Sequence, residues 1–408
     1  MAQEAPRVDR TGQPGGSRRE RTAVWTLLGA NALTGLGIGF FLPILPLFVA
    51  SRGATSLLVG LVFAAGVVGR ALVQYPAGWL SDRVGRRPVL VFGLLAYALL
   101  FPLYLLPVPP AALIAVRFVH ALAGGSVSIA ATALIADLTA VEGRGKAFGR
   151  LRASDMAGIL LGPPVAGLVA SVRLDAVFLG GAVVSLLALL LMLRLPSAQA
   201  PRTVEQQERP VSSWRLVRLL LPVAVLGAPI FWTFGTYDTV WSLYLTSRGA
   251  SPFLVGLSFA TYAAPVILLG GLAGGLADRL GAFRAATLAL LTYGLLAGTY
   301  GFISSVPLLI LVGLLEGALT AAGNPALMAE VSRRAPPGAQ GRTQGAYSLM
   351  LLAGEVAGAV AGGALYLRGP AYAFLGATTV CLAGAACGLA LRWRERAASS
   401  RAPVEPGY

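Results

Sequence analysis

Residues 51–66 read SRGATSLLVGLVFAAG, and residues 247–262 read SRGASPFLVGLSFATY. The two copies are 196 residues apart, and the same offset relates Gly158 to Gly354 much later in each copy. A constant offset without gaps over most of a chain indicates a duplicated structural unit. The sequence therefore predicts two homologous halves.

The composition indicates that both halves lie in a membrane. Of the 408 residues, 56% are hydrophobic and 12% are charged, and the mean hydropathy is +0.74, whereas soluble domains contain roughly 25% charged residues. An apolar segment of about 20 residues spans a hydrocarbon core of roughly 30 Å as a helix. We expect twelve such helices, at residues 23–50, 56–80, 88–107, 111–138, 147–171, 176–194, 218–246, 252–277, 285–304, 306–331, 343–367 and 371–392.

The predicted fold is an all-α membrane protein with twelve transmembrane helices in two pseudo-symmetric six-helix bundles. Because each half contains an even number of spans, both halves start on the same side of the membrane, and such parallel repeats enclose a substrate site near the midplane. The expected divisions are a cytoplasmic tail at 1–21, an N-terminal bundle at 22–195, a cytoplasmic linker at 196–217, a C-terminal bundle at 218–392 and a cytoplasmic tail at 393–408.

The distribution of basic residues predicts the orientation. Of 32 lysines and arginines, 26 lie in the tails and in alternate loops on one side, while the intervening loops contain only Arg52, Arg173, Arg248 and Arg368. The positive-inside rule therefore places both termini in the cytoplasm, with the protein in the plasma (inner) membrane. With the positive charge explained by topology, nucleic-acid binding is not expected, and we expect a monomer.

A charged motif follows the second span. Residues 78–87 read GWLSDRVGRR, and a degenerate copy, GGLADRLG, occupies residues 274–281 after the eighth span. A glycine permits close approach of a neighbouring helix, and a carboxylate among arginines forms a charge-assisted cluster. The motif closely resembles the loop signature of the major facilitator superfamily.

This resemblance implies a conformational latch that holds the cytoplasmic side closed. Its central members would be Asp82, Arg86 and Asp137, the last of which ends the fourth span. The remaining motif residues in the two copies are Gly78, Arg83, Asp278 and Arg279. The alternative is a basic loop that only fixes topology.

The fifth span contains glycines at a spacing similar to that of the family's antiporter signature. Gly149, Gly158, Gly162, Pro163 and Gly167 match it, and an alanine replaces one glycine. The pattern resembles proton-coupled exporters, drug exporters especially. Because the eleventh span has the same small-residue stripe, generic helix packing is the alternative.

The fourth span, LIAVRFVHA at residues 113–121, resembles another family pattern, although His120 and Ala121 replace a glutamine and a glycine. A buried arginine is costly in a membrane unless it faces protein or water, so Arg117 is expected to face a cavity. A structural hydrogen bond is the preferred interpretation of His120, and membership of a central site is the alternative.

Ionisable residues inside spans are functional candidates by default. Those expected here for transport and coupling are Arg70, Arg117, His120, Asp155, Asp238, Glu316 and Glu355. A carboxylate in a partly hydrated cavity can bind and release a proton, so Glu316 or Glu355 is the candidate coupling acid. A static ion pair with Arg70 or Arg117 is the alternative, and Asp155 is a candidate intrahelical partner of Arg152.

Possible substrate contacts surround Asp238 in the seventh span. Phe234, Tyr237 and Trp241 recur at helical spacing near this acid, and an acid among aromatic rings suits a lipophilic cation. The alternative is that the aromatic residues are interfacial anchors and core. Asn31 is a further candidate, in a first span that is rich in small residues.

The sequence thus predicts a secondary active transporter that works by alternating access, in the form of a proton-coupled antiporter exporting small lipophilic or cationic compounds. A facilitator or symporter for a sugar, an organic anion or a lipid is the alternative. An enzyme or receptor is a remote alternative, because the chain has one histidine and two cysteines and lacks metal-ligand spacing. No phosphate-binding loop of an ATP-driven pump occurs, and no cofactor is expected.

Overall fold

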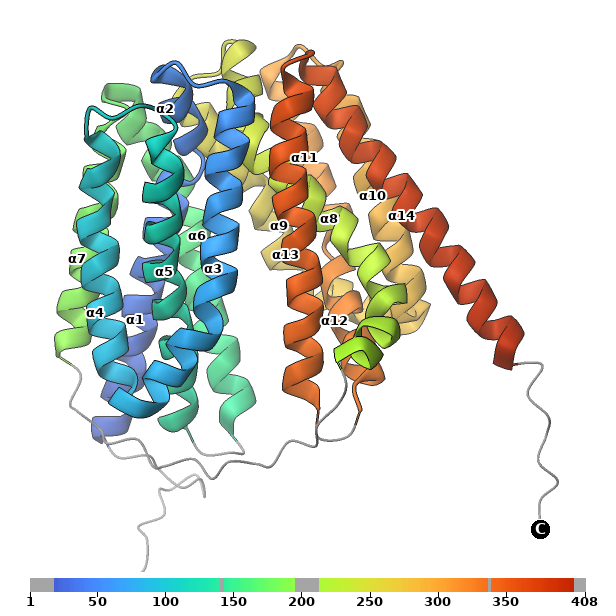
Figure 1. Cartoon of the computed structure of the whole chain (residues 1–408), viewed down its shortest axis with the longest axis horizontal. Coiled ribbons are helices and arrows are strands. Elements are labelled where there is room, and N and C mark those ends of the chain that lie inside the picture. Colours follow the sequence, from blue (N-terminus) through green and yellow to red (C-terminus); the bar gives the residue numbers. More distant parts are fainter. Residues whose placement is uncertain (1–17, 140–142, 195–212, 337–338, 400–408) are drawn as a thin grey trace, which may run out of the picture.

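A computed structural model describes residues 18–139, 143–194, 213–336 and 339–399 (Figure 1). The first bundle contains α1 (Arg18–Phe41), α2 (Leu45–Ser51), α3 (Ser56–Val84), α4 (Arg86–Leu100), the 3-10 helix η1 (Phe101–Leu105), α5 (Ala112–Asp137), α6 (Arg144–Val172) and α7 (Ala176–Leu193). The second bundle contains α8 (Ser213–Ser247), α9 (Pro252–Leu280), α10 (Ala282–Tyr300), α11 (Val306–Thr320), α12 (Gly323–Arg334), α13 (Gln340–Tyr366) and α14 (Pro370–Ser399).

Within the described residues, 12 segments are long and apolar enough to cross a membrane, which confirms the predicted number of spans. α1 and α2 together form the first segment, and α11 and α12 form the tenth. The latter is broken after Thr320, where the ring of Pro325 cannot coexist with a regular helical bond to the carbonyl of Ala321. The protein is a multi-pass membrane protein.

Two helix ends differ from the expected divisions. α8 begins at Ser213, inside the range expected for the linker, and α14 continues to Ser399, inside the range expected for the C-terminal tail. A helix satisfies its backbone hydrogen bonds internally and therefore need not end where the hydrocarbon ends.

The structure repeats with the offset seen in the sequence. α3 and α9 begin and end at positions that are 196 residues apart. Each is followed by a glycine in the left-handed region, Gly85 with φ of 97° and Gly281 with φ of 83°. Glycine adopts this conformation without the steric cost of a Cβ atom, so the same tight junction leads into α4 and α10.

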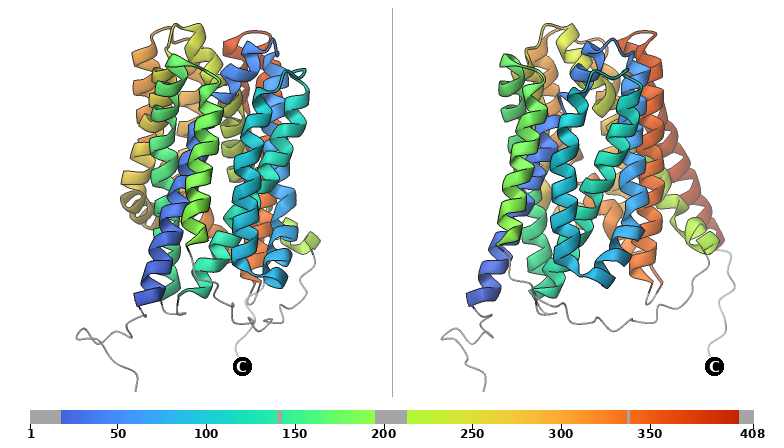
Figure 2. Two further views of the ribbon diagram at one scale, coloured as in Figure 1. Left: turned by 90° about the vertical axis from the view of Figure 1, so that its left-hand side faces the viewer. Right: turned by 60° about the vertical axis from the view of Figure 1, so that its left-hand side comes forward.

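The two bundles lie side by side and meet near one end (Figures 1 and 2). Contacts between them join α6 to α9 and α3 to α13. The Ser56 hydroxyl donates to the Gly363 carbonyl at 2.7 Å, and the Ser242 hydroxyl donates to the Pro43 carbonyl at 2.6 Å. We call this the closed end.

At the opposite end the bundles diverge, as Figure 1 shows for α3 and α13. α7 finishes and α8 starts at this end, which we call the linker end. The α3–α4 and α9–α10 junctions lie at the same end because the two halves are parallel repeats.

Candidate substrate cavity

Three adjacent cavity compartments lie among the described residues. The first, of 520 Å³, is bordered by α1, α3, α5 and α6, and includes Arg70 and Arg117. The second, of 260 Å³, lies between the bundles and includes Asp238 and Glu316. The first two share Ile38 and other lining residues. We call them the arginine compartment and the acidic compartment.

The third compartment, of 420 Å³, extends towards the linker end among α6, α8, α9 and α12. It shares Phe234 and Tyr262 with the acidic compartment and Arg152 with the arginine compartment. Its lining is mainly apolar, so we call it the apolar compartment. The three compartments form one candidate substrate region.

An ion pair joins the two bundles beside the arginine compartment. Arg70 Nη2 of α3 donates to Glu355 Oε1 of α13 at 2.8 Å, with the arginine side chain 47% exposed and the glutamate 10% exposed. The pair has the geometry of the alternative that the sequence offered for these two residues, in which an arginine neutralises a buried acid. Glu316, the other candidate coupling acid, has no ion-pair partner in the described part of the chain.

Asn31 and Asp155 also line the arginine compartment. The Asn31 side-chain amide donates to the Leu151 carbonyl at 3.1 Å and to the Ser154 hydroxyl at 3.2 Å, and so connects α1 to α6. Asp155 forms the expected intrahelical pair with Arg152 at 3.0 Å. Both predicted residues therefore lie at the cavity wall.

Arg117 is buried and lines the arginine compartment. Its guanidinium carbon lies 5.0 Å from the centroid of the Phe41 ring. A Cβ atom at Gly66 would lie 2.6 Å from Arg117 Nε, so the glycine on α3 provides the space for the guanidinium. Among the described residues no carboxylate forms an ion pair with Arg117, and Nε has no hydrogen-bond partner.

His120 lies behind the cavity wall rather than in it. Its ring is fully buried, stacks on Tyr97 with 4.1 Å between centroids, and has Nδ1 3.2 Å from the Tyr104 hydroxyl. Tyr97 and Phe41 stand between His120 and the arginine compartment. This geometry is that of a structural hydrogen bond inside an aromatic cluster.

Glu316 lies in the acidic compartment and is held by tyrosines. The Tyr300 hydroxyl donates to Oε2 at 2.6 Å, and the Tyr237 hydroxyl donates to Oε1 at 3.1 Å. No lysine or arginine pairs with Glu316 in the described part of the chain. The carboxylate therefore has hydroxyl donors but no counter-ion.

Asp238 lines the same compartment, and no hydrogen bond or ion pair is found for it among the described residues. The charge of Asp238 is therefore not neutralised by a contact of its own in the described part of the chain.

Aromatic rings form much of the acidic compartment. Phe234, Tyr237 and Trp241 line it as predicted from their helical spacing. Trp241 is 7% exposed and donates to the Ser258 hydroxyl at 2.9 Å, so it is a cavity residue rather than an interfacial anchor. Tyr262 and Tyr300 complete the wall from α9 and α10.

Sequence reasoning missed Tyr262 and Tyr300. Both lie in helices where we identified no intramembrane charge, and tyrosine in an apolar helix does not by itself indicate a cavity. The usable signal is the repeat, because Tyr104 and Tyr300 occupy equivalent positions, each 16 residues before the residue that it contacts.

The predicted latch residues of the first bundle come together at the linker end. Arg86 donates to Asp82 and, at 3.1 Å, to Asp137 Oδ2 of α5. Arg83 points elsewhere, with its guanidinium carbon 4.0 Å from the centroid of the exposed Trp79 ring. The cluster lies within one bundle and makes no ion pair to the other among the described residues.

Other parts of the latch prediction differ from the structure. A Cβ atom at Gly78 would meet only Ile129 Cγ2, at 4.0 Å, so this glycine does not provide a close helix contact here. In the second copy, the side chain of Asp278 lies outside the described residues, and Arg279 forms no ion pair with the acids that are described.

The glycine stripe of α6 forms close contacts with two helices. Gly158 and Gly162 face the α1 backbone, where an added Cβ atom would lie 2.2 Å from the Ala32 oxygen and 2.7 Å from the Gly39 carbon. Gly167 faces Pro252 of α9 at the closed end, next to Pro163, which lies inside the helix. The stripe therefore fixes both the packing inside the first bundle and its contact with the second.

Two repeated six-span bundles around a cavity with buried charges define a secondary transporter. The family model described as Major Facilitator Superfamily matches residues 27–248 and 223–407. The chain belongs to the Major Facilitator Superfamily.

Two relatives align over most of the chain. Multidrug resistance protein 2 of Bacillus subtilis (strain 168) is 26% identical over 398 residues, which cover 93% of this chain and 97% of the relative. The class C tetracycline resistance protein of Escherichia coli is 30% identical over 366 residues, which cover 85% and 90%.

Solved structures of distant sequence share the fold. The nucleoside transporter NupG superposes with a TM-score of 0.73 at 15% identity, covering 93% of this chain and 98% of that one. A POT family transporter in complex with 5-aminolevulinic acid superposes with a TM-score of 0.75 at 14% identity, covering 94% and 97%.

Proposed function

We propose that this transporter is a proton-coupled antiporter that exports small lipophilic or cationic compounds. The proposal rests on Asp238 and Glu316, which line one aromatic compartment without an ion-pair partner in the described part of the chain. A buried carboxylate is costly unless its charge is neutralised. Either a proton or a cationic ligand can neutralise it, and competition between the two is the basis of exchange.

Of the predicted acids, Glu316 is the preferred coupling residue. Glu355 is already neutralised by Arg70, whereas the Glu316 carboxylate accepts hydrogen bonds from two tyrosine hydroxyls and has no basic partner among the described residues. Asp238 lies in the same compartment and is the second candidate.

Alternating access would proceed by rocking of the two bundles around this compartment. The bundles corresponding to residues 22–195 and 218–392 are in contact at the closed end and diverge at the linker end (Figure 1). Because most basic residues lie towards the linker end, we assign that end and both termini to the cytoplasm of a plasma (inner) membrane. The chain would then face inward as a monomer.

The names of the two aligned relatives favour export of drug-like molecules. One is named for multidrug resistance and the other for tetracycline resistance. The α6 glycines that resemble the antiporter signature lie between α1 and α9, where they can set how closely the bundles approach.

Everted membrane vesicles test the proposal with ethidium, a fluorescent lipophilic cation. An acidic vesicle interior should drive ethidium accumulation, and Glu316→Gln should abolish this coupling. Asp175→Asn is the matched control, because Asp175 is an exposed acid that pairs only with Arg173. Movement that ignores the gradient and is unchanged in Glu316→Gln and Glu355→Gln would contradict proton coupling. Gradient-driven accumulation in intact cells would instead favour a symporter.

A further inference from the structure

The two repeats present opposite charges to the cavity from equivalent helices, α5 with Arg117 and α11 with Glu316. Under the 196-residue offset, Arg117 of α5 corresponds to Gly313 of α11, and Gly66 of α3 corresponds to Tyr262 of α9. At these two pairs of positions the first half has Gly66 and Arg117, and the second half has Tyr262 and Gly313. The exchange places a cation in the first half only.

The acid of the second half also has a counterpart without charge. Glu316 corresponds to His120, and their tyrosine partners, Tyr300 and Tyr104, correspond as well. The imidazole is enclosed behind Tyr97, whereas the carboxylate lines the acidic compartment. The duplicated helices have therefore diverged into a cationic wall and an anionic wall.

Neither wall neutralises its own charge. Arg117 is 6% exposed and has the Tyr104 hydroxyl and the Phe41 ring as neighbours, but no carboxylate partner among the described residues. A guanidinium has five N–H donors, and its Nε–H has no partner. Arg70 cannot be counted as a free charge, because Glu355 pairs with it.

The two walls are close enough to act on one small molecule. The arginine and acidic compartments share Ile38, Leu42 and Ile159. Arg117 lines the first and Asp238 the second, and no ion pair joins the two residues in the described part of the chain. The volumes of the arginine and acidic compartments, 520 and 260 Å³, fall near the range of roughly 300–1,000 Å³ that is typical of ligand pockets.

We propose that the cavity binds a dipolar ligand, with an anionic group at Arg117 and a protonated amine at Asp238 and Glu316. An aromatic body would lie between them against Tyr237 and Trp241, which line the acidic compartment. The dipolar site rests on the proposed transport function, to which it adds the substrate class and the orientation of the bound ligand. A bidentate contact from a guanidinium to a carboxylate provides both the affinity and the orientation.

Three probes on one naphthalene scaffold separate the two charges. The dipolar probe has a carboxylate at one end and a piperazine at the other. Its carboxamide keeps only the amine, and its morpholine analogue keeps only the carboxylate. Binding to the purified full chain is measured by naphthalene fluorescence at neutral pH without a gradient, and the dipolar probe should bind most tightly.

Substitutions then assign each charge to its wall. Arg117→Gln should weaken the dipolar probe by roughly tenfold to a hundredfold, the size expected for a hydrogen bond between charged groups. The carboxamide should bind this variant as it binds the unmodified chain, which also shows that the cavity is folded. Glu316→Gln should weaken the two amines and spare the morpholine analogue.

Two further variants complete the design. Arg117→Lys keeps the charge without the fork of donors and should recover part of the lost affinity. Arg173→Gln is the control, because Arg173 pairs with Asp175 away from the cavity. Equal binding of the three probes, or equal weakening of all three by Arg117→Gln, would overturn the inference.

The binding experiment and the vesicle experiment can fail independently of each other. Charge-specific binding without proton-driven transport would leave the dipolar site standing and remove the antiporter. Proton-driven ethidium transport together with equal probe binding would do the reverse.

Discussion

At the scale of single residues, equivalent positions of the two repeats keep the same tyrosine contact, while the side chain that the tyrosine contacts differs. Tyr104 contacts His120 in the first half, and Tyr300 contacts Glu316 in the second, each across 16 residues. The surrounding rings decide which of the two acceptors reaches the cavity. In the first half Tyr97 covers the imidazole, a geometry that favours a packing role for His120.

His120→Phe should therefore preserve transport and its pH profile. The phenyl ring can keep the contacts with Tyr97 and Phe101, and the loss of the partner of the buried Tyr104 hydroxyl costs about 1–3 kcal/mol. A small decrease in thermal unfolding temperature should be the main effect. His120→Ala removes the ring as well and should lower this temperature further. A changed pH profile in His120→Phe would show that the histidine takes part in coupling.

Among the elements, the glycine-rich faces of α6 and α13 perform the same task in the two halves. Gly158 faces Ala32 of α1, and Gly354 faces Ala228 of α8, which is the equivalent contact. Because the glycines of α13 make the same contacts as those of α6, close packing explains the glycine spacing in both helices. Close helix packing is therefore one requirement behind the antiporter-like pattern, and it would apply whatever the protein transports.

Gly158→Ala and Gly354→Ala should each destabilise the protein by about 1–3 kcal/mol, as overpacking of a close contact does. An added Cβ atom would lie 2.2 Å from the Ala32 oxygen in the first case and 2.5 Å from the Ala228 oxygen in the second. Thermal unfolding in detergent measures the effect.

Gly149→Ala on the same helix is the control, since its added Cβ atom would meet no described atom of another element within 4 Å. Equal stability of Gly149→Ala and Gly158→Ala would contradict the packing assignment. A loss of coupling in Gly158→Ala without destabilisation would indicate a role specific to antiport.

For the whole molecule, hydrogen bonds between side chains and carbonyls contribute to the contact between the bundles. Ser56 and Ser242 belong to different halves, and each donates to a carbonyl of the other half. The ion pair of Arg70 and Glu355 adds a charged contact farther along α3. These interactions favour the conformation in which the closed end is shut.

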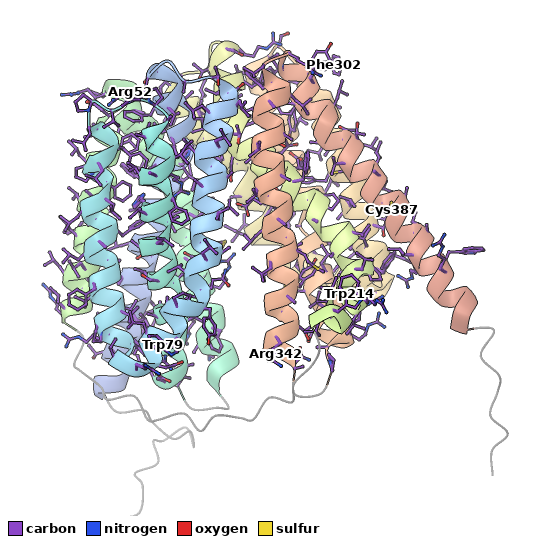
Figure 3. All side chains as sticks on the ribbon, viewed as in Figure 1. Arg52, Trp79, Trp214, Phe302, Arg342 and Cys387 are labelled. Atoms are coloured by element: carbon purple, nitrogen blue, oxygen red, sulfur yellow. The ribbon has the colours of Figure 1, made fainter. Side chains whose placement is uncertain are left out.

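Replacing Ser56 and Ser242 by alanine together should shift the population towards a state open at this end. Two neutral hydrogen bonds at about 1 kcal/mol each correspond to a change in the ratio of states of at least roughly tenfold. Distances between spin labels at Arg52→Cys and Arg248→Cys, in a chain whose native cysteines are replaced, measure the shift. Arg52 lies at the closed end (Figure 3), and Arg248 is its equivalent.

Ser171→Ala is the control for this experiment. The Ser171 hydroxyl donates to the Gly167 carbonyl of its own helix at 2.8 Å, so its loss breaks no contact between the bundles. Identical distance distributions in the double variant and the control would show that the serine contacts do not hold the closed end.

The amino-acid sequence by itself determined the spans, the duplication and the charged positions inside the membrane. These follow from hydropathy and from a constant offset, which are properties of the chain read in order. The contacts of Arg117, Glu316 and Asp238 with their surroundings depend on residues far away in the sequence. Only the tertiary structure decided that Arg70 neutralises Glu355, that Tyr97 covers His120, and that Arg117 stays without a carboxylate partner among the described residues. Helix packing sets these distances, and a linear pattern does not contain them.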